Sequence, residues 1–96
     1  MNEQFSITGK VAVVTGAGGV LGGSIAKSFI DAGAKIVALD IRQKQLDVRI
    51  KELTANGGEV IGIVGNVLDM ESLKKVAKQI VDKWGKIDIL LNIAGG

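Results

Sequence analysis

A glycine-rich segment is the first part of the sequence that could do chemistry. Five glycines follow closely on a short apolar run, namely Gly16, Gly18, Gly19, Gly22 and Gly23. Glycine tolerates positive φ angles and lets a ligand approach the backbone closely. If a helix begins here, its free N–H groups and its dipole can hold a phosphate. Thr15–Gly22 therefore predicts a pyrophosphate site, and the alternative is that some of these glycines only form a tight strand-to-helix turn.

A carboxylate stands at a suitable distance beyond the glycines. Asp40 lies 18 residues after Gly22 (40 minus 22), at the end of a second apolar run. A carboxylate in this place can accept hydrogen bonds from the ribose hydroxyls of adenosine. Its charge would repel a 2′-phosphate, so the pattern favours NAD over NADP, although the guanidinium of Arg42 could turn toward such a phosphate. The alternative for Asp40 is a solvated turn residue.

The elements that must position these residues follow from the spacing of apolar side chains. Four apolar runs are typical of buried strands: Val11–Thr15, Lys35–Asp40, Val60–Val64 and Ile87–Ile93. Between the runs, apolar residues recur at helical spacing, and Asp69 is a candidate N-cap of the third helix. The three stripes are Leu21, Ile25, Phe29 and Ala32; Leu46, Ile50 and Leu53; and Leu73, Val76, Ala77, Ile80 and Trp84.

This βαβαβαβ alternation predicts an α/β fold. Unbroken apolar strands indicate a parallel sheet covered by helices on both faces. Right-handed crossovers favour the strand order 3-2-1-4 of a Rossmann-type doubly wound sheet. We expect residues 1–96 to form a single, partial domain that is truncated after its fourth strand. Because that strand would be an unpaired apolar edge, we also expect a homo-oligomer.

Composition argues against several classes of function. The chain is 47% hydrophobic and 23% charged, with a net charge of +2, no Cys and no His. Its scattered charge argues against a nucleic-acid partner, and the missing Cys and His exclude disulfides, zinc sites, thiol nucleophiles and imidazole bases. We predict no metal. No apolar run approaches the roughly 18 residues of a membrane span, and no signal peptide is evident, so we expect a cytoplasmic protein without a membrane partner.

Two other kinds of nucleotide site fit the sequence less well than a dinucleotide site. A P-loop needs a lysine directly after its glycines, whereas Gly22 and Gly23 are followed by Ser24. A methyltransferase usually has an acidic residue where Thr15 stands. Asp40 itself suits the ribose of adenosylmethionine as well as that of a dinucleotide, so this carboxylate does not separate the two ligands.

Four segments taken together resemble the short-chain dehydrogenase/reductase family. They are Thr15–Gly22, Asp40, Asn66-Val67 and Asn92-Ile93-Ala94-Gly95, and they occur in the family's order and spacing. The resemblance implies that the loop binds pyrophosphate, that Asp40 binds ribose, and that the pair at 66–67 contacts adenine. It also implies that residues 94–95 pass under the cofactor while Asn92 braces the central strands. The cofactor-binding residues expected in this way are Gly16, Gly18, Gly19, Val20, Leu21, Gly22, Asp40, Ile41, Asn66, Val67, Asn92, Ala94 and Gly95.

Three residues depart from the family's pattern. Val20 replaces a glycine of Thr-Gly-x-x-x-Gly-x-Gly, which affects how closely a phosphate can approach the backbone there. Asn66 replaces the aspartate that contacts adenine, but its amide oxygen can still accept a hydrogen bond. Ile93 replaces the second asparagine of Asn-Asn-Ala-Gly, which indicates an apolar neighbour.

The catalytic groups of the family are a serine and a Tyr-x-x-x-Lys pair, and this chain contains no tyrosine. With no histidine to activate them, Ser24, Ser28 and Ser72 are interpreted as surface or packing residues. We therefore expect no catalytic residue in the 96-residue chain, which would be inactive alone.

The resemblance implies an NAD-dependent oxidoreductase as the parent protein, which transfers hydride between NAD(H) and an alcohol or carbonyl substrate. Gly-Gly-Val-Leu-Gly-Gly and Ala-Gly-Gly resemble the branch that reduces sugar acids such as fructuronate. The alternative is a non-catalytic nucleotide-binding or interaction fragment.

Overall fold

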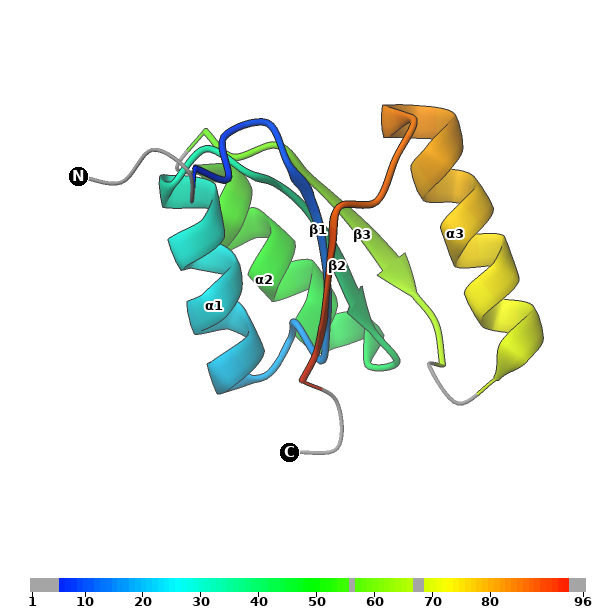
Figure 1. The fold of residues 1–96 in the computed structure, drawn as a ribbon. Helices are drawn as coiled ribbons and strands as arrows, with labels where there is room; N and C mark the ends of the chain where they lie inside the picture. Colours follow the sequence, from blue (N-terminus) through cyan, green and yellow to red (C-terminus); the bar gives the residue numbers. More distant parts are fainter. Residues whose placement is uncertain (1–5, 56, 67–68, 94–96) are drawn as a thin grey trace.

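The computed structural model describes residues 6–55, 57–66 and 69–93, in which strands and helices alternate (Figure 1). The elements are β1 (Val11–Thr15), α1 (Val20–Asp31), β2 (Lys35–Asp40), α2 (Gln43–Ala55), β3 (Val60–Val64), α3 (Met70–Trp84) and β4 (Ile89–Asn92). The predicted α/β alternation is confirmed, and the first three strands have the predicted bounds. The predicted N-cap is confirmed as well, because the carboxylate of Asp69 accepts a hydrogen bond from the Glu71 N–H at 3.0 Å.

The sheet is parallel and has the predicted strand order, β3-β2-β1-β4. Val13 of β1 lies opposite Val37 on β2 and Leu90 on β4. All strands point toward the lower side of Figure 1, so their carboxyl ends lie along one edge of the sheet. Residues that end a strand are therefore brought together at that edge.

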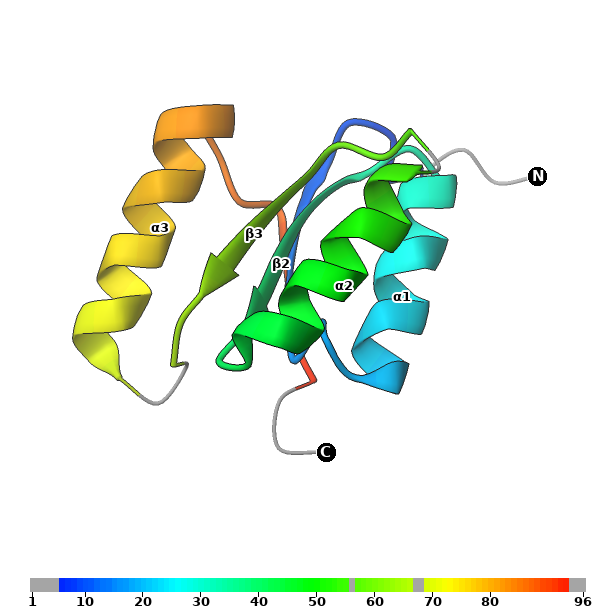
Figure 2. The same cartoon turned by 180° about the vertical axis from the view of Figure 1, so that it is seen from behind.

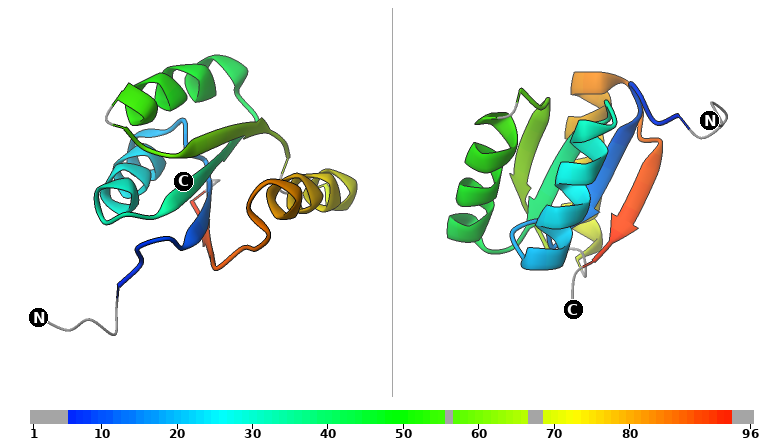
Figure 3. Two further views of the ribbon diagram at one scale, coloured as in Figure 1. Left: turned by 90° about the horizontal axis from the view of Figure 1, so that it is seen from above. Right: turned by 90° about the vertical axis from the view of Figure 1, so that its left-hand side faces the viewer.

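Helices cover both faces of the sheet. Figures 2 and 3 show α1 and α2 against one face and α3 against the other. Successive strand side chains point to opposite faces, so each of the two central strands contributes to two cores. The core under α1 and α2 contains Ala12, Val14, Ile36, Ala38, Leu46 and Leu53. The core under α3 contains Val11, Val13, Val37, Leu39, Val76 and Ile80, with Trp84 packed at its margin.

Strand β4 is shorter than the predicted Ile87–Ile93, since pairing is confined to Ile89–Asn92. At its start, the Asp88 carboxylate accepts the Val11 N–H at 2.8 Å, where a further strand residue would offer a backbone carbonyl. At its end, the Ile93 N–H donates to the Thr15 hydroxyl at 2.9 Å. At each end of the strand a side chain thus takes the place of one backbone partner, while the Asp88 N–H still donates to the Val11 carbonyl at 2.9 Å.

The predicted apolar stripe of α1 is partly wrong. Leu21 is 63% exposed and Ala32 lies just beyond the helix, whereas the buried positions are Gly22, Gly23 and Ala26. The reason is steric, because a Cβ on Gly22 would overlap the carbonyl group of Gly16. The start of α1 therefore lies directly against the glycine loop, and large side chains are excluded from that contact.

Within the described residues, none of the helices combines the length and the apolar character needed to cross a membrane.

Candidate nucleotide-binding site

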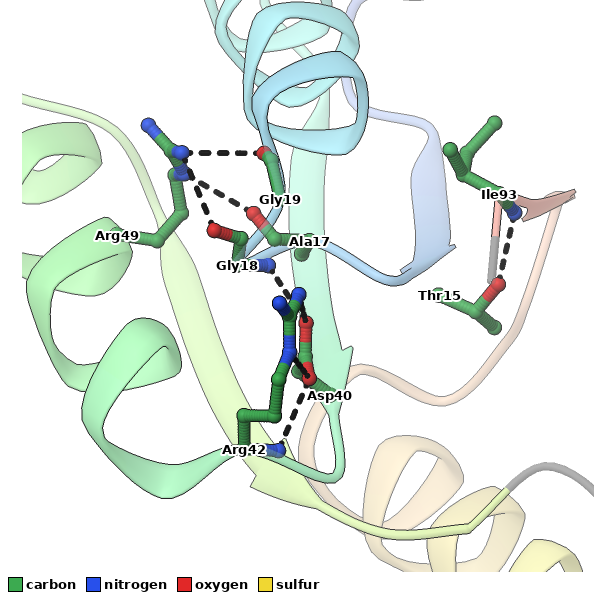
Figure 4. Close-up of polar contacts among 8 residues, drawn as sticks. All are labelled: Thr15, Ala17, Gly18, Gly19, Asp40, Arg42, Arg49 and Ile93. Carbon is green, nitrogen blue, oxygen red and sulfur yellow. Dashed lines mark hydrogen bonds and ion pairs between the residues drawn. The ribbon is translucent and has the colours of Figure 1, made fainter. Parts of the chain in front are cut away.

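The ends of three strands and the glycine loop meet at the carboxyl edge of the sheet. Thr15 ends β1, Asp40 ends β2 and Asn92 ends β4. The loop of residues 16–19 runs from β1 to α1 at the same edge, as Figure 4 shows. The chain order of the strands reverses between β1 and β4, and ligands of open α/β sheets bind in the crevice at such a switch point.

The glycine loop is held in a tight turn by its own backbone. Gly16 has a φ of 66°, which a residue with a Cβ adopts only at a cost. Its carbonyl accepts the Gly19 N–H at 3.0 Å, and Ala17 donates to the Leu39 carbonyl on β2 at 3.2 Å. The turn is thereby fixed both to itself and to the neighbouring strand.

The first turn of α1 presents free donors beside this loop. Gly19 is the N-cap and has no side chain to accept a helix N–H. In the part of the chain that the structure describes, the N–H groups of Val20, Leu21 and Gly22 find no protein acceptor. No acidic residue lies in the first turn to compete for them. Free N–H groups and the positive end of the helix dipole together suit an anion such as a pyrophosphate.

Val20, the departure from the family's glycine pattern, imposes no strain on the backbone. It is the first residue of α1 and is 89% exposed. No residue other than glycine has a positive φ within the described ranges. A valine is therefore compatible with the shape of the loop at this position.

Asp40 is the best-defined polar group of the site. Its side chain is only 3% exposed, and its Oδ2 accepts the Gly18 N–H at 2.9 Å. Arg42 adds a fork, in which Nε donates to Oδ1 and Nη2 to Oδ2, both at 3.0 Å, while the Arg42 backbone N–H donates to Oδ1 at 2.9 Å. Against the opposing effect of burial, these hydrogen bonds, that of the Arg42 side chain above all, lower the pKa of Asp40 to about 2. The carboxylate is therefore ionised at neutral pH and acts as a hydrogen-bond acceptor.

Arg42 lies over the carboxylate that the ribose hydroxyls would need (Figure 4). Sequence reasoning treated this arginine as a group that could turn toward a phosphate, whereas the structure pairs it with Asp40. Its side chain is 48% exposed, so it has room to move outward. A ribose bound at Asp40 would share or replace the two side-chain contacts of the guanidinium.

The other expected residues surround this centre. Ile41 is 63% exposed beside Asp40, and the Gly65 N–H donates to the Asp40 carbonyl at 3.2 Å, which brings the end of β3 to the same edge. Asn66 follows with an exposed side chain. Val67, Ala94 and Gly95 lie outside the described residues.

Thr15 links β1 to β4, a contact that sequence reasoning missed. Its Oγ1 lies 2.9 Å from Oδ1 of Asn92, to which it can donate, and it accepts the Ile93 N–H at 2.9 Å. The position of this threonine could have indicated the contact, since a threonine at the end of a central strand can form hydrogen bonds with polar groups of the neighbouring strand. Asn92 is thereby attached to the strand that leads into the glycine loop.

Arg49 is a second residue that sequence reasoning missed. From α2 it donates Nε to the Ala17 carbonyl at 3.0 Å and Nη2 to the Gly19 carbonyl at 3.1 Å. In the sequence it is simply one of the charged residues of an amphipathic helix, so its spacing gave no indication of this contact.

Among the residues that the structure describes, no three acidic side chains gather in a way that could hold a metal ion. The polar groups found at the candidate site are backbone donors, the Asp40 carboxylate and two arginines.

Comparison with known proteins identifies the relatives of this chain. Residues 10–96 match the short chain dehydrogenase family. The chain is 38% identical over 89 residues to a 3-oxoacyl-(acyl-carrier-protein) reductase from Thermotoga maritima, a match that covers 93% of this chain and 36% of that protein. It is 35% identical over 91 residues to an uncharacterized oxidoreductase, UxuB, from Bacillus subtilis, with 95% of this chain and 33% of that protein covered. The chain thus spans about a third of the length of these relatives.

Solved structures show the same fold. A hydroxysteroid dehydrogenase from Escherichia coli superimposes with a TM-score of 0.88 at 36% identity, covering 94% of this chain and 38% of the other. A putative D-mannonate oxidoreductase from Haemophilus influenza with bound NAD gives a TM-score of 0.89 at 38% identity, covering 97% of this chain and 33% of the other. On the evidence of its sequence match and its strand order, the chain belongs to the short-chain dehydrogenase family.

Proposed function

We propose that this chain is the NAD-binding portion of an oxidoreductase that transfers hydride between NAD(H) and an alcohol or carbonyl substrate. The observation that carries the proposal is a convergence at one sheet edge. Free N–H donors at the start of α1 lie beside an ionised carboxylate, Asp40, which is itself hydrogen-bonded to the loop through Gly18. The two groups match the pyrophosphate and the ribose of one dinucleotide.

The residues present fit the cofactor in their charge, and glycine allows the loop and α1 to lie close together. The Gly16 carbonyl lies where a Cβ on Gly22 would be, so the loop and α1 can only approach each other this closely with glycine. When bound, NAD⁺ would accept a hydride from an alcohol, or NADH would donate one to a carbonyl. The contribution of this chain is to bind and orient the dinucleotide. Because the chain has no tyrosine, we expect the 96 residues alone to bind cofactor without catalysing the reaction.

The charge at the ribose end favours NAD over NADP. A 2′-phosphate would meet the Asp40 carboxylate, which the pKa of about 2 keeps ionised at neutral pH. The pairing of Arg42 with this carboxylate weakens the repulsion without abolishing it. Support comes from two similar solved structures with bound NAD, from Burkholderia phymatum and Haemophilus influenza.

We place the substrate of the whole protein among sugars and sugar acids. Support comes from the Gly-Gly-Val-Leu-Gly-Gly segment and from the similarity to the putative D-mannonate oxidoreductase. A direct test would follow oxidation or reduction of a panel of sugar acids, sugar alcohols and steroids by a protein that carries this segment together with a catalytic Tyr-x-x-x-Lys.

Titration calorimetry of this chain with NAD, and separately with NADP, tests the cofactor assignment. We expect NAD to bind more tightly, and Asp40→Ala to weaken NAD about tenfold or more, since hydrogen bonds to a charged group contribute about 1.5–3 kcal/mol. Asp47→Ala is a matched control, because this carboxylate lies on α2 and accepts only from Gln43 among the contacts described. A chain that is folded by circular dichroism yet binds neither nucleotide would contradict the proposal and favour an interaction fragment.

A further inference from the structure

Arg49 contacts the glycine loop from the side of α2. Its Nε and Nη2 donate to the carbonyls of Ala17 and Gly19 at 3.0 and 3.1 Å, and Nη2 also lies 3.4 Å from the Gly18 oxygen (Figure 4). Its Nη1 donates to the Glu52 carboxylate at 2.9 Å, and this ion pair further restrains the orientation of the guanidinium. The side chain is 21% exposed. One guanidinium thus holds three consecutive carbonyls of the loop.

These contacts also determine where the loop N–H groups point. In a trans peptide, the C=O of one residue and the N–H of the next point in opposite directions. Carbonyls turned toward Arg49 therefore turn the following N–H groups away from it. The Gly18 N–H reaches Asp40 at 2.9 Å, and the Gly19 N–H reaches the Gly16 carbonyl at 3.0 Å. The third N–H, that of Val20, has no protein acceptor within the described residues.

Gly23 makes this arrangement sterically possible. A Cβ on Gly23 would overlap the guanidinium carbon and Nε of Arg49, and Arg49 supplies all three of the nearest atoms at that position. Because those atoms end a flexible side chain, an alanine there would be accommodated by displacing the guanidinium from the loop. A glycine inside a helix is otherwise unfavourable, so its presence on the first turns of α1 has a specific reason.

We propose that Arg49 is a positioning residue for cofactor binding, and that Gly23 provides the space it needs. By fixing the peptide planes between residues 17 and 20, Arg49 directs the Val20 N–H toward the place of the pyrophosphate. This inference rests on the proposed function, because the ligand of that N–H is the cofactor assigned above.

The test is a double-mutant cycle on the full chain, with NAD affinity measured by calorimetry. The variants are Arg49→Met, which keeps the length of the side chain, Gly23→Ala, and the two combined. Arg49→Lys keeps the charge but not the planar fork, so it separates charge from positioning. Lys51→Met is the matched control, since it removes one positive charge from the exposed face of the same helix.

We expect Arg49→Met, Arg49→Lys and Gly23→Ala each to weaken NAD binding about tenfold, as loss of charge-assisted hydrogen bonds does. The combined variant should lose no more than either single one, because both changes remove the same contact. Lys51→Met should bind as the unchanged chain does. Unchanged affinity in Arg49→Met, or additive losses in the combined variant, would overturn the inference.

Amide hydrogen exchange gives a readout that a general loss of stability would not produce. We expect faster exchange at Gly18 and Gly19 in Arg49→Met and in Gly23→Ala, with the β1 amide of Val13 unchanged. If the unchanged chain binds no nucleotide, the proposed function fails, while exchange still decides the role of Arg49. Equal exchange of the loop amides in variant and unchanged chain would show that Arg49 does not position them.

Discussion

At the scale of single residues, Asp40 joins the two halves of the candidate site. The same carboxylate fixes the loop through Gly18 and faces the place proposed for the ribose. Its low pKa arises mainly from Arg42, the residue that also occupies its oxygens. The pair therefore sets both the charge of the site and the competition that a ribose would meet.

Replacing Arg42 by alanine should sharpen the choice of cofactor. Without the guanidinium, the Asp40 oxygens are free for the ribose hydroxyls, and nothing offsets the repulsion of a 2′-phosphate. We expect the ratio of NAD to NADP affinity to rise about tenfold, which corresponds to roughly 1.4 kcal/mol. Calorimetry with both nucleotides measures the ratio, and Lys44→Ala, an exposed cation two residues further on, serves as the control. A ratio that falls would show that Arg42 assists NAD.

The same variant should change unfolding by acid. The folded-state pKa of Asp40 is lowered from 3.8 to about 2, so its contribution to stability is present above pH 3.8 and is lost as the pH falls toward 2. Because Arg42 is the main cause of the shift, Arg42→Ala should lose most of this dependence. Urea unfolding measured between pH 5 and pH 2, about the range that spans both pKa values, reports the difference. Identical pH profiles for the two chains would contradict this account of the pKa.

At the scale of elements, the bounds of a strand were predicted best where the strand coincides with an unbroken apolar run. The runs of β1 and β2 are apolar because both faces of these strands are buried, so their bounds are visible in the sequence. The bounds of β4 were not, because the carboxylate of Asp88 and the hydroxyl of Thr15 replace backbone partners at its two ends. Whether a side chain takes the place of a backbone partner in this way depends on which strands become neighbours in the sheet.

Sequence reasoning about the helices and the site is limited in the same way, because it does not reveal which distant segments come into contact. The stripe of α2 was predicted correctly, since Leu46 and Leu53 are buried in the core beneath it. The stripe of α3 was predicted in part, since Val76 and Ile80 are buried whereas Leu73 is 36% exposed. The face of α1 was not predicted correctly, because its closest contact is with backbone and selects glycine. The position of Asp40 beside the glycine loop could be predicted from the number of residues that separate it from the loop. The role of Arg49 could not, because it lies 32 residues from the Ala17 carbonyl that it contacts.

The link between β1 and β4 can be tested by Thr15→Val, which removes the hydroxyl but keeps the shape of the side chain. The Asn92 oxygen and the Ile93 N–H then lose their partner at the end of the sheet. We expect the free energy of unfolding to fall by about 1 kcal/mol, as for the loss of a part-buried hydrogen bond whose remaining partners can reach water. Urea denaturation measures the loss. Thr54→Val is the control, since that hydroxyl bonds only within α2 among the contacts described, and equal losses in both variants would contradict the proposed link.

At the scale of the whole molecule, the strands of the sheet are covered unequally by helices and by neighbouring strands. β1 and β2 are central, and α1 and α2 cover one face of the sheet while α3 covers part of the other (Figure 3). β4 lies at the edge of the described sheet, and its Leu90 is 66% exposed. The candidate site at the ends of β1 and β4 therefore adjoins an apolar edge of the kind that pairs with another chain or segment.

This edge leads to a prediction about assembly. We expect the 96-residue chain to self-associate through β4, and Leu90→Lys to shift it toward the monomer, because a charged side chain on an edge strand opposes pairing. Sedimentation velocity over a range of concentrations measures the change. Val81→Lys introduces the same charge at a site on α3 that is 49% exposed, and it should leave association unchanged. If both variants associate as the unchanged chain does, the contact lies elsewhere. If β4 is the contact, addition of a complementing strand should compete with self-association and protect the Leu90 and Leu91 amides from exchange.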